Sequence, residues 1–241
     1  MKKLFIILCL VLVVHAGKSQ VIISLVFGDK LNSDKIEFGL DGGLTLSDMQ
    51  GLDQSKVLGG FNLGFYFDFK MKNPNWMLNT GVLVKSPMGA RGLPVYSLNN
   101  PDLDNAFAGG SVTTNLRYFN VPVMMKYQFK NKFFAKAGIQ LGLMNKAFDE
   151  FSNSIVADDD LKFERKTRDL YHPLDAGLTF GIGYRLMKGK GMNLGIQYYL
   201  GLVDVLIDDN TPGQMNRAWY FNVGIPIGKA AAQKKAAQKE K

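Results

Sequence analysis

Apolar residues alternate with polar residues or glycine along eight stretches of the chain, each roughly ten residues long. In the second stretch, for example, Phe61 and Leu63 alternate with Asn62 and Gly64. A period of two is the spacing of a β-strand whose two faces meet different surroundings. The eight stretches are 36–46, 59–69, 76–86, 116–129, 133–144, 174–186, 192–202 and 217–227. The sequence therefore predicts an all-β chain of eight strands.

The connections between these strands alternate between short and long. Tight turns at 71–75, 130–132 and 187–191 join the second strand to the third, the fourth to the fifth and the sixth to the seventh. The other four connections are longer, and those at 87–112 and 145–173 are the longest. Outer-membrane barrels have short turns in the periplasm and long loops outside. The pattern predicts an eight-stranded antiparallel up-and-down transmembrane β-barrel with both termini in the periplasm.

Glycine and bulky residues indicate which face of the strands points outward. Most strand glycines, such as Gly64 and Gly138, share the polar face, and small residues make room inside a narrow barrel. Phenylalanine, tryptophan and leucine crowd the other face and would overfill that interior. The strands also match the roughly 9–11 residues of a tilted membrane strand better than the roughly five or six of a common soluble one. A soluble eight-stranded barrel is the alternative.

The two ends of the chain differ from the barrel in composition. Residues 1–19 have two lysines, an apolar run and then small residues, which is the pattern of a secretory signal peptide. We expect cleavage after Ser19, or alternatively after Gly17, and either cut removes Cys9, the one cysteine of the chain. The predicted organisation is a signal peptide at 1–19, an N-terminal periplasmic segment at 20–34, the barrel domain at 35–228 and a Lys/Ala-rich periplasmic tail at 229–241.

The roles of the two flanking segments stay open. The 20–34 segment either extends the first strand or folds beneath the barrel. The tail is either disordered or a short helix that touches anionic lipid. The ends also supply most of the net charge of +8, since 1–19 contributes +3 and the tail +4. The remaining +1 gives little support to nucleic-acid binding, and no run of 18 apolar residues predicts a spanning helix.

The fourth strand contains the sequence YFNVPVMMKY at 118–127. It resembles the Y-x-x-(I/V)-P-φ-φ-φ-K-Y/F strand (φ apolar) of the PorT-type outer-membrane β-barrel family of Bacteroidota. The resemblance covers about 35–228, with eight strands in matching order. It implies an outer-membrane barrel, and one branch of that family is associated with a system that secretes proteins across the outer membrane. One departure is the last strand, which ends at Ile225-Pro226-Ile227 instead of the usual terminal aromatic residue.

Charged residues fall on the inward register of the predicted strands, with equal numbers of acids and bases. Unpaired charges are costly in a narrow lumen, whereas paired and hydrogen-bonded ones are tolerated. We interpret the set as an ion-pair network that fills the barrel, with a gated path for protons or small ions as the alternative. Lys85 and Asp175 should lie near the outer end, and the periplasmic end should hold Glu37, Asp68, Lys126, Lys136 and Arg185. Asp41 completes the set.

Two arginines break the apolar outward register. Arg117 and Arg217 each stand at the expected extracellular start of a strand. A guanidinium at this level suits the phosphates of lipopolysaccharide, and simple snorkelling to the membrane rim is the alternative. The loops at 87–112 and 145–173 are the expected places for partner binding. The three aspartates at 158–160 either bind calcium or form a solvated charged loop.

Catalytic and metal chemistry find little support. The expected mature chain has one histidine, His172, and no motif that pairs it with a serine nucleophile. A Cys/His metal site and a cofactor site are equally unsupported. The sequence therefore predicts a non-enzymatic structural or surface-interaction protein whose partners are outer-membrane lipid and lipopolysaccharide. The alternative is a component of a transport or protein-secretion complex with other envelope proteins.

Overall fold

The structure is a computed structural model that describes residues 31–33, 35–52, 54–154, 161–189, 191–208 and 212–227. The predicted signal peptide, most of the 20–34 segment, the aspartates at 158–160 and the tail at 229–241 lie outside these ranges. Within them the strands are β1 (Ile36–Gln50), β2 (Lys56–Lys70), β3 (Trp76–Leu93), β4 (Ser111–Gln128), β5 (Phe133–Asn153), β6 (Leu161–Lys166), β7 (Leu174–Arg185), β8 (Asn193–Gly201) and β9 (Met215–Pro226). None of the helices in these ranges is long and apolar enough to cross a membrane.

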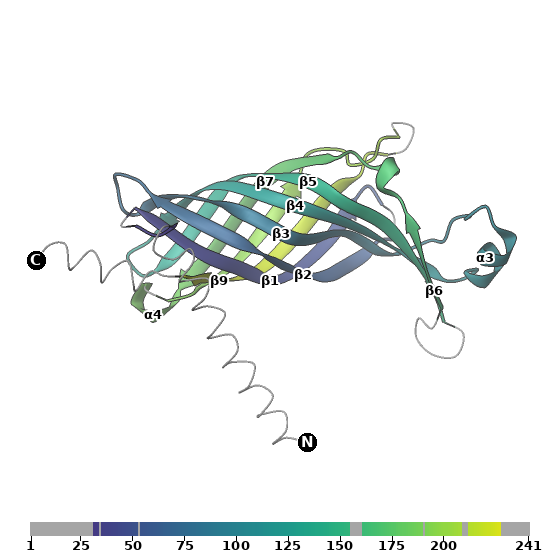
Figure 1. Ribbon diagram of the computed structural model, residues 1–241, viewed down its shortest axis with the longest axis horizontal. Helices are drawn as coiled ribbons and strands as arrows, with labels where there is room; N and C mark the ends of the chain where they lie inside the picture. Colours follow the sequence, from purple (N-terminus) through teal and green to yellow (C-terminus); the bar gives the residue numbers. More distant parts are fainter. Residues whose placement is uncertain are drawn as a thin grey trace, which may run out of the picture.

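Eight of these described strands close into a ring of tilted antiparallel strands (Figure 1). The order around the ring is β1-β2-β3-β4-β5-β7-β8-β9, and β9 pairs back with β1. β6 stands outside the ring and pairs only with the last residues of β5. The eight-stranded antiparallel barrel predicted from the alternation is therefore confirmed.

The two ends of the barrel are unlike. Short hairpins join β2 to β3, β4 to β5 and β7 to β8 at one end, called here the turn end. The β7–β8 hairpin contains α4 (Leu186–Gly189), where Met187 and Lys188 have φ of 50° and 53°. Left-handed residues of this kind match the twist of a tight hairpin. The opposite end, called the loop end, carries β6 and α3 (Pro101–Ala106) (Figure 1).

Much of what was predicted as long loop at the loop end is strand. β3 continues to Leu93, β4 starts already at Ser111 and β5 continues to Asn153. The alternation fails there because β-bulges shift its phase: Asn145, for example, is an extra residue between two consecutive pairs of the β4–β5 ladder. A strict period of two therefore ends at the bulge although the strand does not.

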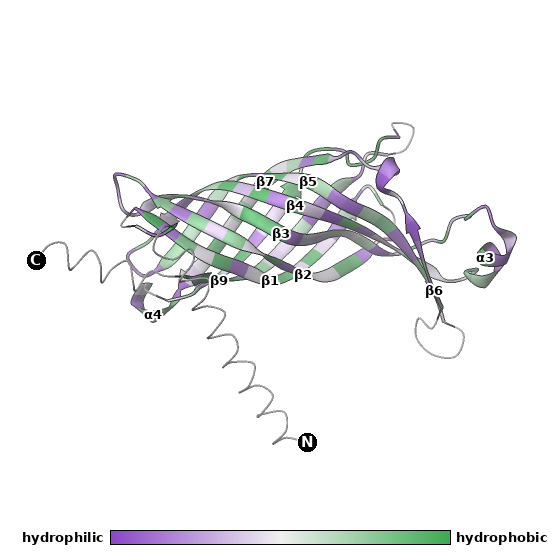
Figure 2. Cartoon of the chain, in the orientation of Figure 1, coloured by the Kyte–Doolittle hydropathy of each residue, from purple (hydrophilic) through white to green (hydrophobic). Residues whose placement is uncertain are grey.

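Residues 94–110, the loop-end parts of β4 and β5, and β6 form a projection beyond the ring. The projection has its own apolar cluster, in which Phe107, Val112 and Phe151 are buried. The rings of Phe107 and Phe151 lie 5.9 Å apart, edge to face, and Phe163 of β6 packs beside them. Figure 2 shows mostly hydrophilic residues along β6, whereas the barrel wall alternates in hydropathy. The projection is thus a small packed body.

Hydrogen bonds fix the loop 94–110 to the strands of the projection. The Tyr96 hydroxyl donates to Asp149 at 2.6 Å, and Thr114 donates to the other oxygen of the same carboxylate at 2.7 Å. Burial, and then this hydrogen bond, raise the pKa of Tyr96. Asp104 accepts from the Leu98 N–H and the Ser97 hydroxyl, and these bonds hold the pKa of Asp104 below its usual value.

Candidate functional site

The barrel interior begins at the turn end with a buried ion pair. Lys126 Nζ lies 2.6 Å from Asp68 Oδ2, and both side chains are at most 4% exposed. The Asn79 amide donates to the other Asp68 oxygen at 2.7 Å, and the ring of Phe134 lies 4.5 Å from Lys126 Nζ. Both charges are therefore paired and further solvated by protein groups, as burial requires.

A second buried pair stands at the same end. Arg185 Nη2 lies 2.7 Å from Glu37 Oε1. The Tyr66 hydroxyl donates to Glu37 at 3.1 Å and accepts from the Asn193 amide at 3.2 Å. The pair joins β7 to β1 across the interior, with partners from β2 and β8.

Asp41 and Lys136 line a small cavity between these two pairs. The cavity measures about 30 Å³, which is room for about two water molecules. The Asn222 amide donates to Asp41 at 3.3 Å. The structure thus brings the predicted turn-end charges together at the turn end, with Asp41 among them.

Polar side chains fill the middle of the interior. The Tyr220 hydroxyl lies 3.3 Å from both Ser86 Oγ and Gln140 Nε2, at the centre of residues from three strands. Asp175 accepts from the Asn216 amide at 2.8 Å. Among the described residues no cation forms a salt bridge with Asp175, so the Asn216 amide, a neutral group, is a donor that it meets.

An apolar cluster fills the loop end of the interior. Met49, Met88, Leu116 and Val205 are at most 1% exposed. Sequence reasoning missed this cluster and expected ions and glycine throughout. Met49, Met88 and Val205 all lie in stretches interpreted as connections, so the sequence offered no strand register that would have placed them inward.

The prediction that Lys85 belongs to the interior network is wrong. The side chain is exposed on the outer face of β3, where Lys85 pairs with the outward Leu63 of β2. A β-bulge causes the difference, because Leu63 pairs with Lys85 and the next residue, Gly64, pairs with Leu83. The extra residue, Val84, reverses the faces from that point on. The interior therefore holds four predicted acids and three predicted bases.

Arg117 lies outward as predicted, and other basic residues lie near it. It pairs directly with Lys146 of β5, and the two cations flank the ring of Phe148 at 5.1 Å and 4.1 Å. Lys166 of β6 pairs with Phe148 on the same face. Lys85 lies two residues before Pro87, the β3 partner of Arg117. We call Lys85, Arg117, Lys146 and Lys166 the basic strip.

The basic strip marks the limit of the apolar outer wall. On the turn-end side of the strip, the outward residues of β4 are Phe119, Val121, Val123 and Met125, all more than a third exposed. On the other side they are Asn115 and Thr113. Lys146 also pairs with Glu164 at 2.7 Å, but among the described residues no carboxylate forms a salt bridge with Lys85 or Arg117. The strip is net positive.

Arg217, the other predicted lipid contact, is engaged within the wall. Its guanidinium donates to the carbonyls of Gly201 at 2.6 Å and Asn216 at 3.0 Å, and to the Gln50 side chain. These contacts join β8, β9 and β1 at the loop end. The described residues include no group of three or more His, Cys, Asp or Glu side chains that could hold a metal ion.

Comparison with curated proteins gives no match. Similar solved structures include Ail, the attachment invasion locus protein of Yersinia pestis (14% identity, 80% of this chain and 99% of that chain covered, TM-score 0.40). Neisserial surface protein A (10%, 79% and 96%, 0.39) and OprG from Pseudomonas aeruginosa (12%, 82% and 95%, 0.34) are others. A profile of the outer membrane protein beta-barrel domain matches residues 27–206. The chain therefore belongs to the outer membrane protein beta-barrel domain family and is an outer-membrane protein of a gram-negative bacterium.

Proposed function

We propose that this protein is a closed, non-enzymatic barrel that binds phosphorylated lipid at its loop end and presents the projection at the cell surface. The proposed orientation puts the turn end in the periplasm, because short turns face the periplasm and long connections face outward in barrels of this kind. The basic strip then lies at the outer boundary of the membrane. The observation that carries the proposal is this strip of cations, placed where the apolar wall ends.

The occupied interior supports the proposal of a closed barrel. Two buried ion pairs cross it at the turn end, hydroxyl and amide groups meet around Tyr220, and the apolar cluster fills the loop end. An eight-stranded barrel is only wide enough for side chains to fill it. We infer that the interior side chains stabilise the barrel and that the barrel conducts no ions or solutes.

A closed barrel should be silent in electrical recordings. Purified protein reconstituted into planar bilayers is expected to give no step conductance above the bare membrane. As a positive control for the method, an open porin is recorded in the same bilayers. Reproducible steps from the wild type would contradict closure and favour the gated ion path. Such steps should then change when the Lys126–Asp68 pair is replaced.

Lipopolysaccharide is the ligand class that best fits the basic strip. Arg117 offers a planar guanidinium group, which suits phosphate oxygens and lies over the ring of Phe148. Lys85 and Lys146 add two further cations on neighbouring strands. Just below them, Phe119 and Leu143 face the acyl chains. Phosphate above and hydrocarbon below is the order of groups in a lipopolysaccharide headgroup region.

The triple variant Lys85→Gln, Arg117→Gln, Lys146→Gln should bind lipopolysaccharide at least about tenfold more weakly, since each surface cation contributes about 1 kcal/mol to anionic lipid binding. The affinity is measured by titrating the purified protein in micelles with lipopolysaccharide at two salt concentrations. The matched control neutralises three exposed turn-end lysines, Lys35, Lys70 and Lys72. Equal losses in both triple variants would reduce the effect to net charge and overturn the assignment of the strip.

The structure gives less support to a secretion role of the PorT type than to lipid binding. In the motif at 118–127, Lys126 forms the interior pair with Asp68, and the Pro122 carbonyl accepts from the Thr80 hydroxyl at 2.8 Å. These contacts serve the barrel itself. The projection could hold an envelope partner, but no described contact of the motif favours that role over surface binding.

A further inference from the structure

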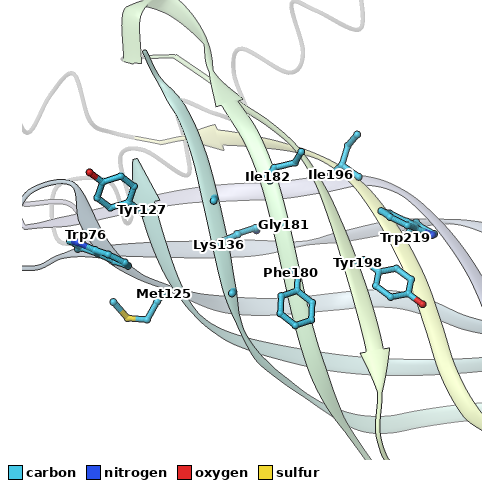
Figure 3. Close-up of a pocket in the computed structure, with 12 residues that line it drawn as sticks. Trp76, Met125, Tyr127, Lys136, Phe180, Gly181, Ile182, Ile196, Tyr198 and Trp219 are labelled. Carbon is cyan, nitrogen blue, oxygen red and sulfur yellow. The ribbon is translucent and has the colours of Figure 1, made fainter. Parts of the chain in front are cut away.

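The outer wall of the barrel has a wide hollow of about 690 Å³ near the turn end (Figure 3). Its floor is formed by Ala135 and Ala137, the two small residues on the outward face of β5, between Phe133 and Ile139. The register sets large neighbours on either side: Ala137 lies between Met125 of β4 and Phe180 of β7. The hollow is therefore built by side-chain size and does not depend on a gap between strands.

The lining of the hollow is almost wholly apolar. Ile182, Ile196 and Phe180 give it an aliphatic and aromatic wall, and Ile182 is 66% exposed. Lys136 also borders it, but this residue belongs to the inward register and lines the interior cavity. Aromatic pairs bound the hollow, Trp76 with Tyr127 at 4.9 Å and Tyr198 with Trp219 at 4.7 Å. Such amphipathic rings favour the membrane interface.

Lysines gather at the turn end of this hollow. Lys130 and Lys132 lie in the β4–β5 turn, and Lys188 lies in the β7–β8 hairpin. The two turns are in contact, because the Arg185 N–H donates to the Lys132 carbonyl at 3.0 Å. Lys130 and Lys188 are exposed. The strands that wall the hollow thus end in a group of cations.

We propose that the hollow is a phospholipid site, in which one acyl chain lies over Ala135 and Ala137 and the phosphate binds to Lys130, Lys132 and Lys188. An apolar trough whose end is basic matches a lipid that has an anionic head and a hydrocarbon tail. The choice of phospholipid over lipopolysaccharide rests on the proposed orientation, which places the turn end in the periplasmic leaflet. The site is separate from the basic strip at the opposite end.

The two tryptophans of the chain, Trp76 and Trp219, both line the hollow, which gives a direct optical test. The protein in micelles is titrated with a phospholipid whose acyl chains carry bromine, a contact quencher of tryptophan fluorescence. A site predicts quenching that saturates at a low mole fraction of lipid. Random contact with mixed micelles predicts quenching that rises in proportion to the mole fraction, and this result in the wild type would overturn the proposal.

Ala137→Phe fills the floor and is expected to abolish the saturating part of the quenching. Leu141→Phe, farther along the same outward face of β5, is the matched control and should leave it unchanged. The triple variant Lys130→Gln, Lys132→Gln, Lys188→Gln should raise the half-saturating concentration about tenfold or more. Gel mobility before and after heating checks that each variant is folded. Unchanged saturation in Ala137→Phe or in the lysine variant would overturn the proposal.

A parallel titration uses unlabelled competitors and separates this site from the proposed orientation. Competition by unlabelled phospholipid supports the proposal. Competition by lipopolysaccharide alone overturns the phospholipid occupant and also argues against the periplasmic placement of the turn end. Micelles have no leaflets, so the quenching itself does not depend on the orientation of the barrel. It also does not depend on the basic strip, so this proposal can hold even if the strip does not bind lipopolysaccharide.

Discussion

Replacing Lys126 with alanine is expected to lower the free energy of unfolding of the barrel by about 3–5 kcal/mol, the usual cost of removing one partner of a buried ion pair. The Asp68 side chain is 1% exposed and would lose the ammonium group 2.6 Å away, which leaves the Asn79 amide as its partner. The loss of the ammonium group also removes its contact with the ring of Phe134.

The measurement is the urea midpoint of unfolding in detergent micelles. Lys146→Ala is the matched control, because Lys146 forms an ion pair with Glu164 at 2.7 Å in which both side chains are at least 40% exposed. Exposed pairs contribute about 0–1 kcal/mol. The double variant Lys126→Ala, Asp68→Ala should recover part of the loss, since it leaves no unpaired charge. Equal midpoints for Lys126→Ala and Lys146→Ala would contradict a structural interior network.

Gly138→Val should prevent the barrel from forming. A Cβ atom on Gly138 would overlap the carbonyl oxygen of Val123 and lie 2.7 Å from the Cα of Met124. Both atoms belong to the backbone of β4, which cannot withdraw without breaking the β4–β5 ladder. The loss in the free energy of unfolding should therefore be larger than the value typical of overpacked side chains, about 1–3 kcal/mol.

The control is the same substitution at Gly59, where an added Cβ finds its nearest neighbour, the flexible end of Leu46, at 3.8 Å. Valine favours strands, so Gly59→Val should fold as well as the wild type. The readout is the folded fraction after refolding into micelles, taken from the unheated gel band. A folded fraction for Gly138→Val that matches Gly59→Val would show that the strands have room to adjust there.

Alternation predicted the strands well because the two faces of a membrane barrel meet very different surroundings. All eight predicted segments correspond to ring strands, and the outward placement of residues such as Phe61 and Phe119 followed from the same rule. The rule failed at β-bulges, which leave no mark in composition. Lys85 was assigned to the wrong face for this reason, and the strand beyond Asn145 was taken for loop.

The candidate sites divide in the same way. The register placed Asp68 and Lys126 inside at one end, yet it could not show which acid meets which base, because pairing depends on the stagger around the ring. The hollow depends on Ala137 having large neighbours on two other strands. The basic strip likewise brings together β3, β4, β5 and β6. Such neighbours are known only once the register between the strands is known.

The continuity of β4 and β5 has a mechanical consequence. Their ladder runs from Ser111–Ser152 in the projection to Gln128–Phe134 at the turn end, with one bulge at Asn145. A tensile force on the projection, applied by a partner bound there, would load these hydrogen bonds in parallel along the strand axes and would not peel them one at a time. The barrel would then anchor the projection firmly in the membrane, because the same two strands form part of both.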